Sequence, residues 1–141
     1  MKTLIIYYSY TGKTKKLAQH LADKEQTDMI ELKDQKRPST IGAYVAGSLS
    51  ARRQKQAKLQ PFKADFSAYE KIIVAMPVWA GFPAPAFNNI VALLPSGKQV
   101  EIIMTSGGGD SGDTQKRVRA MLSEKGCTLA GFQDVKASEI G

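Results

Sequence analysis

The chain has 141 residues, of which 43% are hydrophobic, and its formal net charge is +7. This composition is typical of a folded globular protein and excludes an intrinsically disordered chain. No apolar run approaches the roughly 20 residues of a membrane-spanning helix, and the single cysteine, Cys127, excludes an internal disulfide. We therefore expect one domain over residues 1–141, in the reducing environment of the cytoplasm.

The N-terminal part of the sequence predicts a strand, a tight loop and a helix. The apolar run Leu4–Tyr8 is shorter than the about 7–15 apolar residues of a signal peptide, so we interpret it as a buried strand. The only histidine, His20, falls away from the apolar face of the following helix, which predicts that it is exposed to solvent. That face carries residues at helical spacing: Thr14, Leu17, Ala18, Leu21 and Ala22.

Strands and helices continue to alternate along the rest of the chain. Ile72–Met76 is apolar on both faces, as expected of a central parallel strand. In chain order, the first predicted elements are a strand at 27–32, a helix that begins at Ile41, becomes basic toward its end and stops before Pro61, a strand at 72–76 and an irregular proline-rich loop at 77–85. The later ones are a helix at 87–94, a strand at 100–104, a glycine-rich loop at 105–112, a helix that ends at Gly126 with Val118, Met121 and Leu122 facing inward, and a strand at 128–135.

This alternation predicts an α/β fold with a five-stranded parallel sheet and helices on both faces. The order expected for five such strands is 2-1-3-4-5, in which a ligand lies beyond the carboxyl ends of strands 1 and 3. The loops after strands 1, 3 and 4 meet at that edge, and they are the unusual loops of this sequence. The sequence therefore predicts one binding site built from these loops.

The first of these loops predicts a phosphate site. Its sequence is Ser9-Tyr10-Thr11-Gly12-Lys13-Thr14, which offers three serine and threonine hydroxyl groups, a glycine and a helix N-terminus that favours an anion. An ordinary N-cap explains one such hydroxyl but explains three less well. A P-loop is excluded because its pattern needs a glycine where Tyr7 stands, and because the strands ending at Met76 and Met104 lack the Mg²⁺-binding Asp.

The other two loops predict the surroundings of a flat ring. Trp79 is the only tryptophan, and at this edge it can stack on a heterocycle; the alternative is that it fills a gap between loop and core. Gly107–Gly112 contains the G-x-G-x-x-G pattern of a dinucleotide site, but only one strand follows it, so the acidic ribose-binding residue has no place. We interpret these glycines as a backbone wall against a ring edge.

These loops resemble those of the flavodoxin family. Ser9, Thr11, Gly12 and Thr14 match its [ST]-x-T-G-x-T phosphate loop, and Pro-x-Trp-x-Gly at 77–81 is similar to the loop whose aromatic residue covers one flavin face. The resemblance spans nearly the whole chain and implies a three-layer flavodoxin-like fold with noncovalent FMN. The FMN-binding residues that we predict are Ser9, Tyr10, Thr11, Gly12, Lys13, Thr14, Pro77, Val78, Trp79, Ala80, Gly81, Phe82, Ser106, Gly107, Gly108, Gly109 and Asp110.

The resemblance implies a redox function with two open roles. The first is an electron carrier that acts with a redox partner protein, and the alternative is a small NAD(P)H-dependent FMN reductase of quinones or similar acceptors. The basic charge departs from acidic carrier flavodoxins, and no aromatic residue from Thr105 to Gly112 supplies the second stacking face that the family often has. A further alternative is a flavodoxin-fold module that binds another phosphate ligand without redox activity.

The sequence predicts neither a metal site nor a catalytic acid, base or nucleophile. One histidine and one cysteine cannot form a zinc site or a catalytic triad. The cations Arg52, Arg53, Lys55 and Lys58 could attract an acidic partner or a nucleotide, or they are simply a solvated surface. Nucleic acid is not expected as a partner, because no aromatic residues are interleaved with this basic cluster.

The end of the sequence suggests self-association. Only residues 136–141 come after the last strand, too few for the helix that would cover one face of Ile72–Met76 and Val100–Met104. Exposed apolar faces usually mark an interface, so we expect a homodimer. The alternatives are that another segment, such as Pro61–Tyr69, covers the face, or that the sequence lacks a C-terminal extension.

Overall fold

The computed structural model describes residues 3–9, 12–25, 27–33, 59–79, 82–109 and 112–140, apart from the side chains of Lys24, Glu25 and Trp79. The predicted helix from Ile41 to the residue before Pro61 lies outside the described residues as far as position 58, together with its basic cluster at 52–58, and the described Leu59 and Gln60 are not helical. The described residues on either side of positions 34–58 lie next to each other, because the Gln60 N–H donates a hydrogen bond of 2.7 Å to the Lys33 carbonyl oxygen.

The described residues form one sheet in which the order of the parallel strands is β2-β1-β3-β5-β6. The strands are β1 (Thr3–Tyr8), β2 (Asp28–Leu32), β3 (Lys71–Trp79), β5 (Gln99–Ser106) and β6 (Thr128–Lys136), and the short β4 (Phe82–Pro83) pairs antiparallel with β3 alone. Counted without β4, this is the order 2-1-3-4-5, so the prediction is confirmed. Long apolar runs explain the result, since the central strands are buried on both faces.

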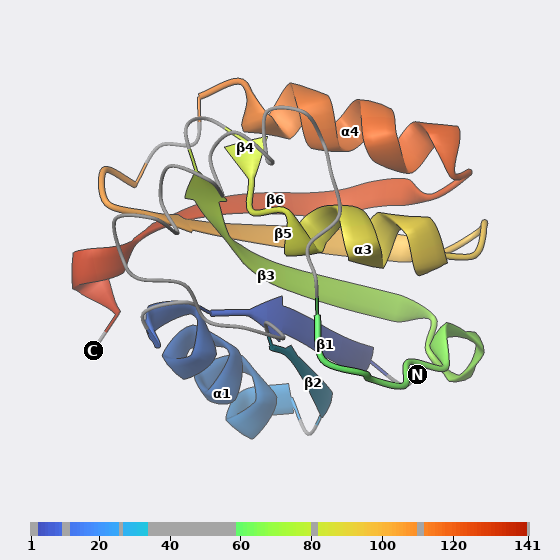
Figure 1. Cartoon of the computed structure of the whole chain (residues 1–141), viewed down its shortest axis with the longest axis horizontal. Helices are drawn as coiled ribbons and strands as arrows, with labels where there is room; N and C mark the ends of the chain where they lie inside the picture. Colours follow the sequence, from blue (N-terminus) through green and yellow to red (C-terminus); the bar gives the residue numbers. More distant parts are fainter. Residues whose placement is uncertain are drawn as a thin grey trace.

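Helices cover the sheet on both faces, as Figure 1 shows. α1 (Lys13–Glu25) packs on one face, over a cluster that includes Ile5, Ile73 and Ile103. α3 (Ala86–Leu93) and α4 (Thr114–Glu124) lie on the other face, over the larger part of the core. Single-turn 3₁₀ helices occur at Phe66–Ala68 and Ala137–Glu139. Within the described ranges, no helix is long and apolar enough to cross a membrane.

The expectation of an irregular loop throughout 77–85 is wrong. β3 continues through Pro77 to Trp79, turns, and pairs with β4 through Val78–Pro83 and Trp79–Phe82. A proline is tolerated here because β1 pairs with β3 only as far as Ala75, so Pro77 lies where the strand has lost one parallel neighbour. The Pro77 carbonyl still accepts a hydrogen bond of 2.9 Å from the Ala84 N–H.

The expectation that an apolar sheet face lies in water is also wrong for the side chains beneath the anticipated last helix. Ile73 and Ile103 are only 3% and 6% exposed in the single chain. Nearer the start of the strands, the same face carries an ion pair instead of apolar groups, with Lys71 Nζ 3.0 Å from Glu101 Oε1. Self-association remains a prediction, but it loses this structural reason.

The strands begin at the edge opposite the predicted site, which we call the opposite edge. Here α4 ends before Gly126, whose φ of 74° suits the left-handed turn that follows the helix. The Gly97 N–H donates to the Gly126 carbonyl at 2.9 Å, and the buried Cys127 thiol donates to the Pro95 carbonyl at 3.1 Å. These contacts close the sheet at a distance from the three loops.

Candidate functional site

The carboxyl ends of β1, β3 and β5 form the site edge, where the loops predicted from sequence meet. We call residues 9–12 the first loop, the turn from Pro77 to Pro83 the hairpin, and residues 106–112 the glycine loop. Tyr10 and Thr11 of the first loop, Ala80 and Gly81 of the hairpin, and Asp110 of the glycine loop lie outside the described residues. The roles of these five residues therefore stay predictions from sequence.

The first loop joins β1 to α1 through a compact turn. The Ser9 Oγ accepts a hydrogen bond of 2.9 Å from the Gly12 N–H, and Gly12 has a φ of 94°, which a residue with a side chain rarely adopts. The Lys16 N–H donates to the Gly12 carbonyl at 3.1 Å, so the helix begins immediately after the turn. The N–H groups of the first helical turn therefore face outward with no intrahelical acceptor.

Thr14 lies at the start of α1, and its side chain is buried. Its Oγ1 is 2.8 Å from the Oγ1 of Thr105 at the end of β5, and one of these hydroxyls donates to the other. This bond connects the first loop with the strand that leads to the glycine loop. Sequence reasoning missed Thr105, whose only signal was a polar residue ending an apolar strand.

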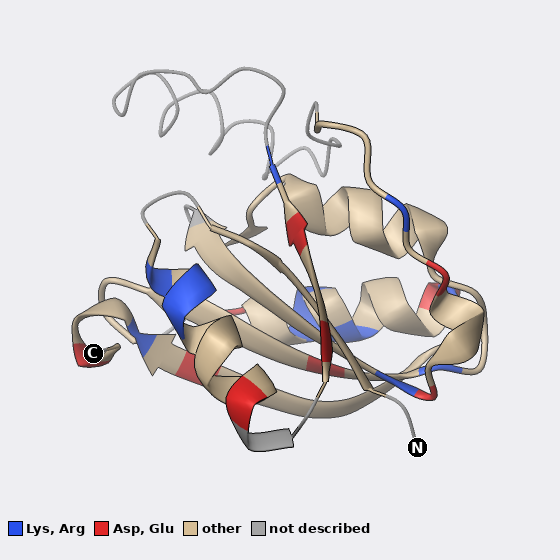
Figure 2. Ribbon diagram, turned by 90° about the horizontal axis from the view of Figure 1, so that it is seen from below, with Lys and Arg blue, Asp and Glu red and all other residues tan. Residues whose placement is uncertain are grey.

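Positive charge is concentrated at the N-terminus of α1. The first turn contains Lys13, Lys15 and Lys16 and no acidic residue, and Figure 2 shows basic groups at the start of the helix and an acidic group toward its end. Cations at a helix N-terminus oppose the helix dipole, so a bound anion would relieve an unfavourable arrangement. Lys13 Nζ lies 3.4 Å from the Ile140 carbonyl oxygen, which tethers this cation to the end of the described chain.

One of these lysines is partly neutralised by β2. Lys15 Nζ lies 3.6 Å from Glu31 Oε2, and the Tyr7 hydroxyl donates to the same carboxylate oxygen at 3.4 Å. Burial, followed by the charge of Glu31 and its hydrogen bond, raises the pKa of Tyr7 to about 12. Tyr7 is therefore protonated at neutral pH and acts as a hydrogen-bond donor beneath the start of α1.

The hairpin brings an aromatic residue to the site edge. Phe82 is half-buried, and its ring lies under the guanidinium of Arg117 from α4, with 4.0 Å from Cζ to the ring centroid. In the β3–β4 pair Phe82 lies opposite Trp79, of which the structure describes the backbone. Stacking of Trp79 on a flavin thus stays a prediction, whereas the Arg117 contact was not anticipated from sequence.

The glycine loop repeats the turn of the first loop. The Ser106 Oγ accepts a hydrogen bond of 2.9 Å from the Gly109 N–H, and Gly109 has a φ of 74°. A Cβ placed on Gly107 or Gly108 would meet no atom within 4 Å, whereas one on Gly109 would lie 3.1 Å from the Lys136 Cβ. One side of the loop is therefore open, and the other packs against the end of β6.

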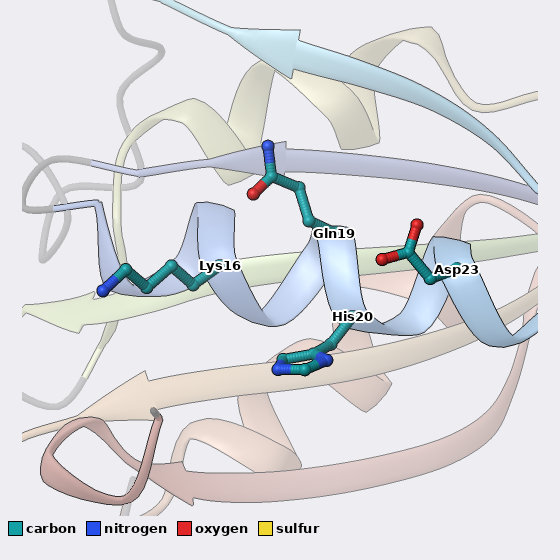
Figure 3. A pocket seen from close by; sticks show the side chains of 4 residues that line it. All are labelled: Lys16, Gln19, His20 and Asp23. Carbon is teal, nitrogen blue, oxygen red and sulfur yellow. The ribbon is translucent and has the colours of Figure 1, made fainter.

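A pocket of about 230 Å³ lies away from these loops, on the outer surface of α1. Its lining side chains are Lys16, Gln19, His20 and Asp23, which come from a single helix, as Figure 3 shows. His20 is exposed, as predicted. No group of three or more His, Cys, Asp and Glu side chains that could hold a metal ion occurs among the residues that the structure describes.

The donor set at the site edge fits the two ends of FMN. For the phosphate there are the N–H groups of the first helical turn, the Ser9 hydroxyl, the Lys13 amine and open space beside Gly12. For the ring there are the hairpin and the open side of Gly107 and Gly108. This chemistry suits binding and orientation of a phosphate-bearing ring.

Comparisons with known proteins point the same way. The sequence model of the family described as NADPH-dependent FMN reductase matches residues 1–136. Among solved structures, a flavoprotein from Lactobacillus acidophilus NCFM in complex with FMN has a TM-score of 0.79 at 22% identity, over 93% of this chain and 91% of that chain. A Bacteroides eggerthii protein has a TM-score of 0.78 at 19% identity, over 99% of this chain and 92% of that chain.

A flavodoxin from Streptococcus pneumoniae TIGR4 is more distant, with a TM-score of 0.58 at 16% identity over 99% of this chain and 88% of that chain. At these identities the structural likeness shows the fold alone, and a search of curated proteins gives no match. The family match confirms the predicted flavodoxin resemblance and the predicted FMN cofactor. The chain therefore belongs to the family of NADPH-dependent FMN reductases, which are flavodoxin-like FMN-binding proteins.

Proposed function

We propose that this chain is an FMN-dependent oxidoreductase that accepts electrons from NAD(P)H and passes them to a quinone or a similar small acceptor. The observation that carries the proposal is the glycine loop. It has no aromatic residue from Thr105 to Gly112, and open space lies beside Gly107 and Gly108. A flavin covered by the hairpin on one face would keep its other face accessible to a nicotinamide ring, and the family description names NADPH as the donor.

The residues of the first loop would hold the FMN phosphate. Gly12 lets the backbone approach the anion, Ser9 and the first N–H groups of α1 donate hydrogen bonds, and Lys13 supplies charge. Thr11 belongs to the same proposal through its motif. Thr14 would contribute through its backbone and through the bond that holds β5 in place, since its hydroxyl already has Thr105 as partner.

The hairpin and the glycine loop would hold the ring. The hairpin residues 77–82 would exclude water from one face, and backbone groups of Ser106–Gly109 would meet the ring edge. When bound, FMN supplies the hydride- and electron-accepting chemistry, and the protein supplies position and electrostatics. The basic first turn of α1 would also attract an anionic nucleotide donor.

An electron carrier is the second candidate, and the fold favours it to the extent that structural neighbours include a flavodoxin. The two functions differ in one measurable property. A reductase oxidises NADH or NADPH directly and turns over with a quinone, whereas a carrier needs a separate reductase for its own reduction.

The test uses purified protein reconstituted with FMN. We expect a yellow protein with a flavin spectrum that is bleached by NADPH or NADH without air and reoxidised by a quinone. A yellow protein that neither nucleotide reduces, but that dithionite reduces, would establish the carrier. A colourless protein that fails to retain FMN would support a phosphate-binding module instead.

A further inference from the structure

The contact between Arg117 and Phe82 joins the hairpin to α4, the helix that follows the glycine loop. Arg117 lies near the start of α4, the helix that comes after the glycine loop, and its guanidinium Cζ is 4.0 Å from the centroid of the Phe82 ring. Phe82 belongs to β4, the returning strand of the hairpin. We call this cation–π contact the clasp. It is the kind of contact in which a planar guanidinium stacks better than an ammonium group.

The hairpin needs such support because it is short. β4 has two residues, and its antiparallel pairing with β3 consists of Val78–Pro83 and Trp79–Phe82. A further backbone bond runs from the Ala84 N–H to the Pro77 carbonyl at 2.9 Å, Val78 packs against the core, and Pro83 is buried. An isolated two-stranded hairpin is marginally stable in water, so a side-chain contact to a packed helix affects where the hairpin lies.

The helix that carries Arg117 is a firm support. α4 buries Thr114, Val118 and Leu122 against the core, and these residues follow the helical spacing of one inward face. Arg117 is half-buried beside this face, whereas Arg119, two residues later, is exposed. Arg119 therefore has the same charge on the same helix, without the Phe82 contact.

We propose that Arg117 is a positioning residue. Through Phe82, it holds the hairpin in the position required to cover one face of the flavin ring. The proposal rests on the proposed FMN site and deepens it. It predicts that the first loop determines the affinity for the phosphate, whereas the clasp determines the affinity for the ring. Arg117 itself need not touch the cofactor.

The experiment compares variants of the full chain in its FMN-free form. Arg117→Met removes the charge and keeps much of the length, Arg117→Lys keeps the charge, Phe82→Leu removes the ring, and Arg119→Met is the matched control. Each protein is titrated with FMN, with riboflavin, and with inorganic phosphate as a competitor of FMN. The fluorescence of Trp79, the only tryptophan, is recorded before any ligand is added.

We expect Arg117→Met and Phe82→Leu to weaken FMN and riboflavin several-fold, with phosphate competition unchanged and with the larger loss in Phe82→Leu, because Phe82 also belongs to the proposed ring site. Arg117→Lys should restore part of the loss, and the double variant Arg117→Met/Phe82→Leu should be no weaker than Phe82→Leu alone, since Arg117 acts only through Phe82. The ligand-free Trp79 emission should shift in these variants but not in Arg119→Met, because Trp79 pairs with Phe82 in the hairpin.

Unchanged riboflavin affinity and unchanged Trp79 emission in both Arg117→Met and Phe82→Leu would overturn the proposal. An equal loss of phosphate and riboflavin affinity would also overturn it, because Arg117 would then act on the whole site. Far-UV circular dichroism identifies any variant that fails to fold, and the milder Arg117→Lys then decides by the same readouts. A wild-type protein that binds no FMN refutes the proposed function, while its Trp79 emission still tests the clasp.

Discussion

The first loop and the glycine loop use the same turn at two places on one sheet edge. Each begins with a serine at the end of a buried parallel strand, and each serine Oγ accepts the N–H of a glycine three residues later at 2.9 Å. Each glycine has a positive φ, 94° for Gly12 and 74° for Gly109. The strands β1 and β5 are not neighbours, since β3 lies between them.

The loops differ in the segment that comes after the turn. α1 begins directly after Gly12 and presents a first turn of lysines, whereas α4 begins only at Thr114, beyond Gly112. A Cβ on Gly12 would enter open space, while a Cβ on Gly109 would meet Lys136. One turn geometry would therefore serve two purposes in the proposed FMN site: the first loop would offer donors and charge to the phosphate, and the glycine loop would offer backbone groups to the ring.

The largest effect should come from the bond that ties the two regions together. Thr14→Val or Thr105→Val alone leaves a buried hydroxyl without its partner, which should lower the free energy of unfolding by about 1–3 kcal/mol. The double variant should recover most of that loss, because two apolar groups of the same shape need no hydrogen bond. Urea unfolding of the three proteins measures this, and additive losses would contradict the bond.

The same variants separate stability from phosphate binding. The sequence motif assigns the Thr14 hydroxyl to the phosphate, and in the structure this hydroxyl forms a hydrogen bond with that of Thr105. If the hydroxyl serves both, FMN affinity falls in Thr14→Val but not in Thr105→Val. We expect equal and small changes in FMN affinity for both variants, measured by fluorescence titration with the Thr105→Val protein as control.

The next effect distinguishes the two glycines. Alanine at either position must adopt a left-handed conformation, which costs roughly 1–2 kcal/mol of stability, and Gly109→Ala should lose more because Lys136 lies in the way. FMN affinity should show the opposite order, with a loss of about tenfold or more for Gly12→Ala, whose methyl group enters the anion space. Equal affinities in the two variants would remove the distinction between the loops.

A smaller effect is expected at the two serines. Ser9→Ala and Ser106→Ala each remove the acceptor of one partly buried glycine N–H, for which we expect about 0.5–1.5 kcal/mol in unfolding free energy. Only Ser9→Ala should also weaken competition by inorganic phosphate. Phosphate inhibition of FMN binding checks this, and a comparable weakening in Ser106→Ala would show that both loops contact the anion.

The smallest effect at neutral pH belongs to Tyr7, beneath the first loop. Its pKa is raised to about 12 in the folded chain, so the stability that it contributes is complete below pH 10, its ordinary pKa, and is lost as the pH rises through the folded value. Wild-type protein should therefore lose stability between about pH 10 and 12 more steeply than Tyr7→Phe. Parallel slopes in denaturant titrations across that range would contradict the shift.

The assignment of that alkaline loss needs one comparison. Tyr69 at the opposite edge donates a hydrogen bond of 2.6 Å to Asp28, and this bond raises its pKa as well. Tyr69→Phe serves as the matched control, because it removes a tyrosine of raised pKa that is distant from the first loop. The Tyr7 contribution is the part of the slope that survives in Tyr69→Phe and disappears in Tyr7→Phe.

Local patterns were sufficient for the sheet order and for the turns at Gly12 and Gly126. The alternation of apolar strands with helically spaced segments can be recognised in short stretches of sequence, and Gly12 and Gly126 mark the ends of the elements beside them. The hairpin was not predicted, because Pro77 reads as a strand breaker unless the end of the β1 pairing at Ala75 is known. Where the β1 pairing ends is a property of the folded sheet, and the sequence around Pro77 does not reveal it.

Contacts between distant residues account for the rest. Thr14 and Thr105 are 91 positions apart, and no spacing rule connects them. Arg117 and Phe82 likewise belong to different elements, and their contact depends on how α4 crosses the hairpin. The burial of Ile73 and Ile103 could not be derived either, because counting elements indicates which helices exist but not how completely they shield a strand.

The sole cysteine has a practical consequence. Cys127 is buried at the opposite edge, where its thiol donates to the Pro95 carbonyl. A thiol reagent can modify Cys127 only when that edge opens. The labelling rate therefore measures how often the edge remote from the proposed cofactor site opens. If FMN slows Cys127 labelling by as much as its effect on the free energy of unfolding requires, the sheet opens as one cooperative unit. If FMN leaves the labelling rate unchanged, the two edges open independently.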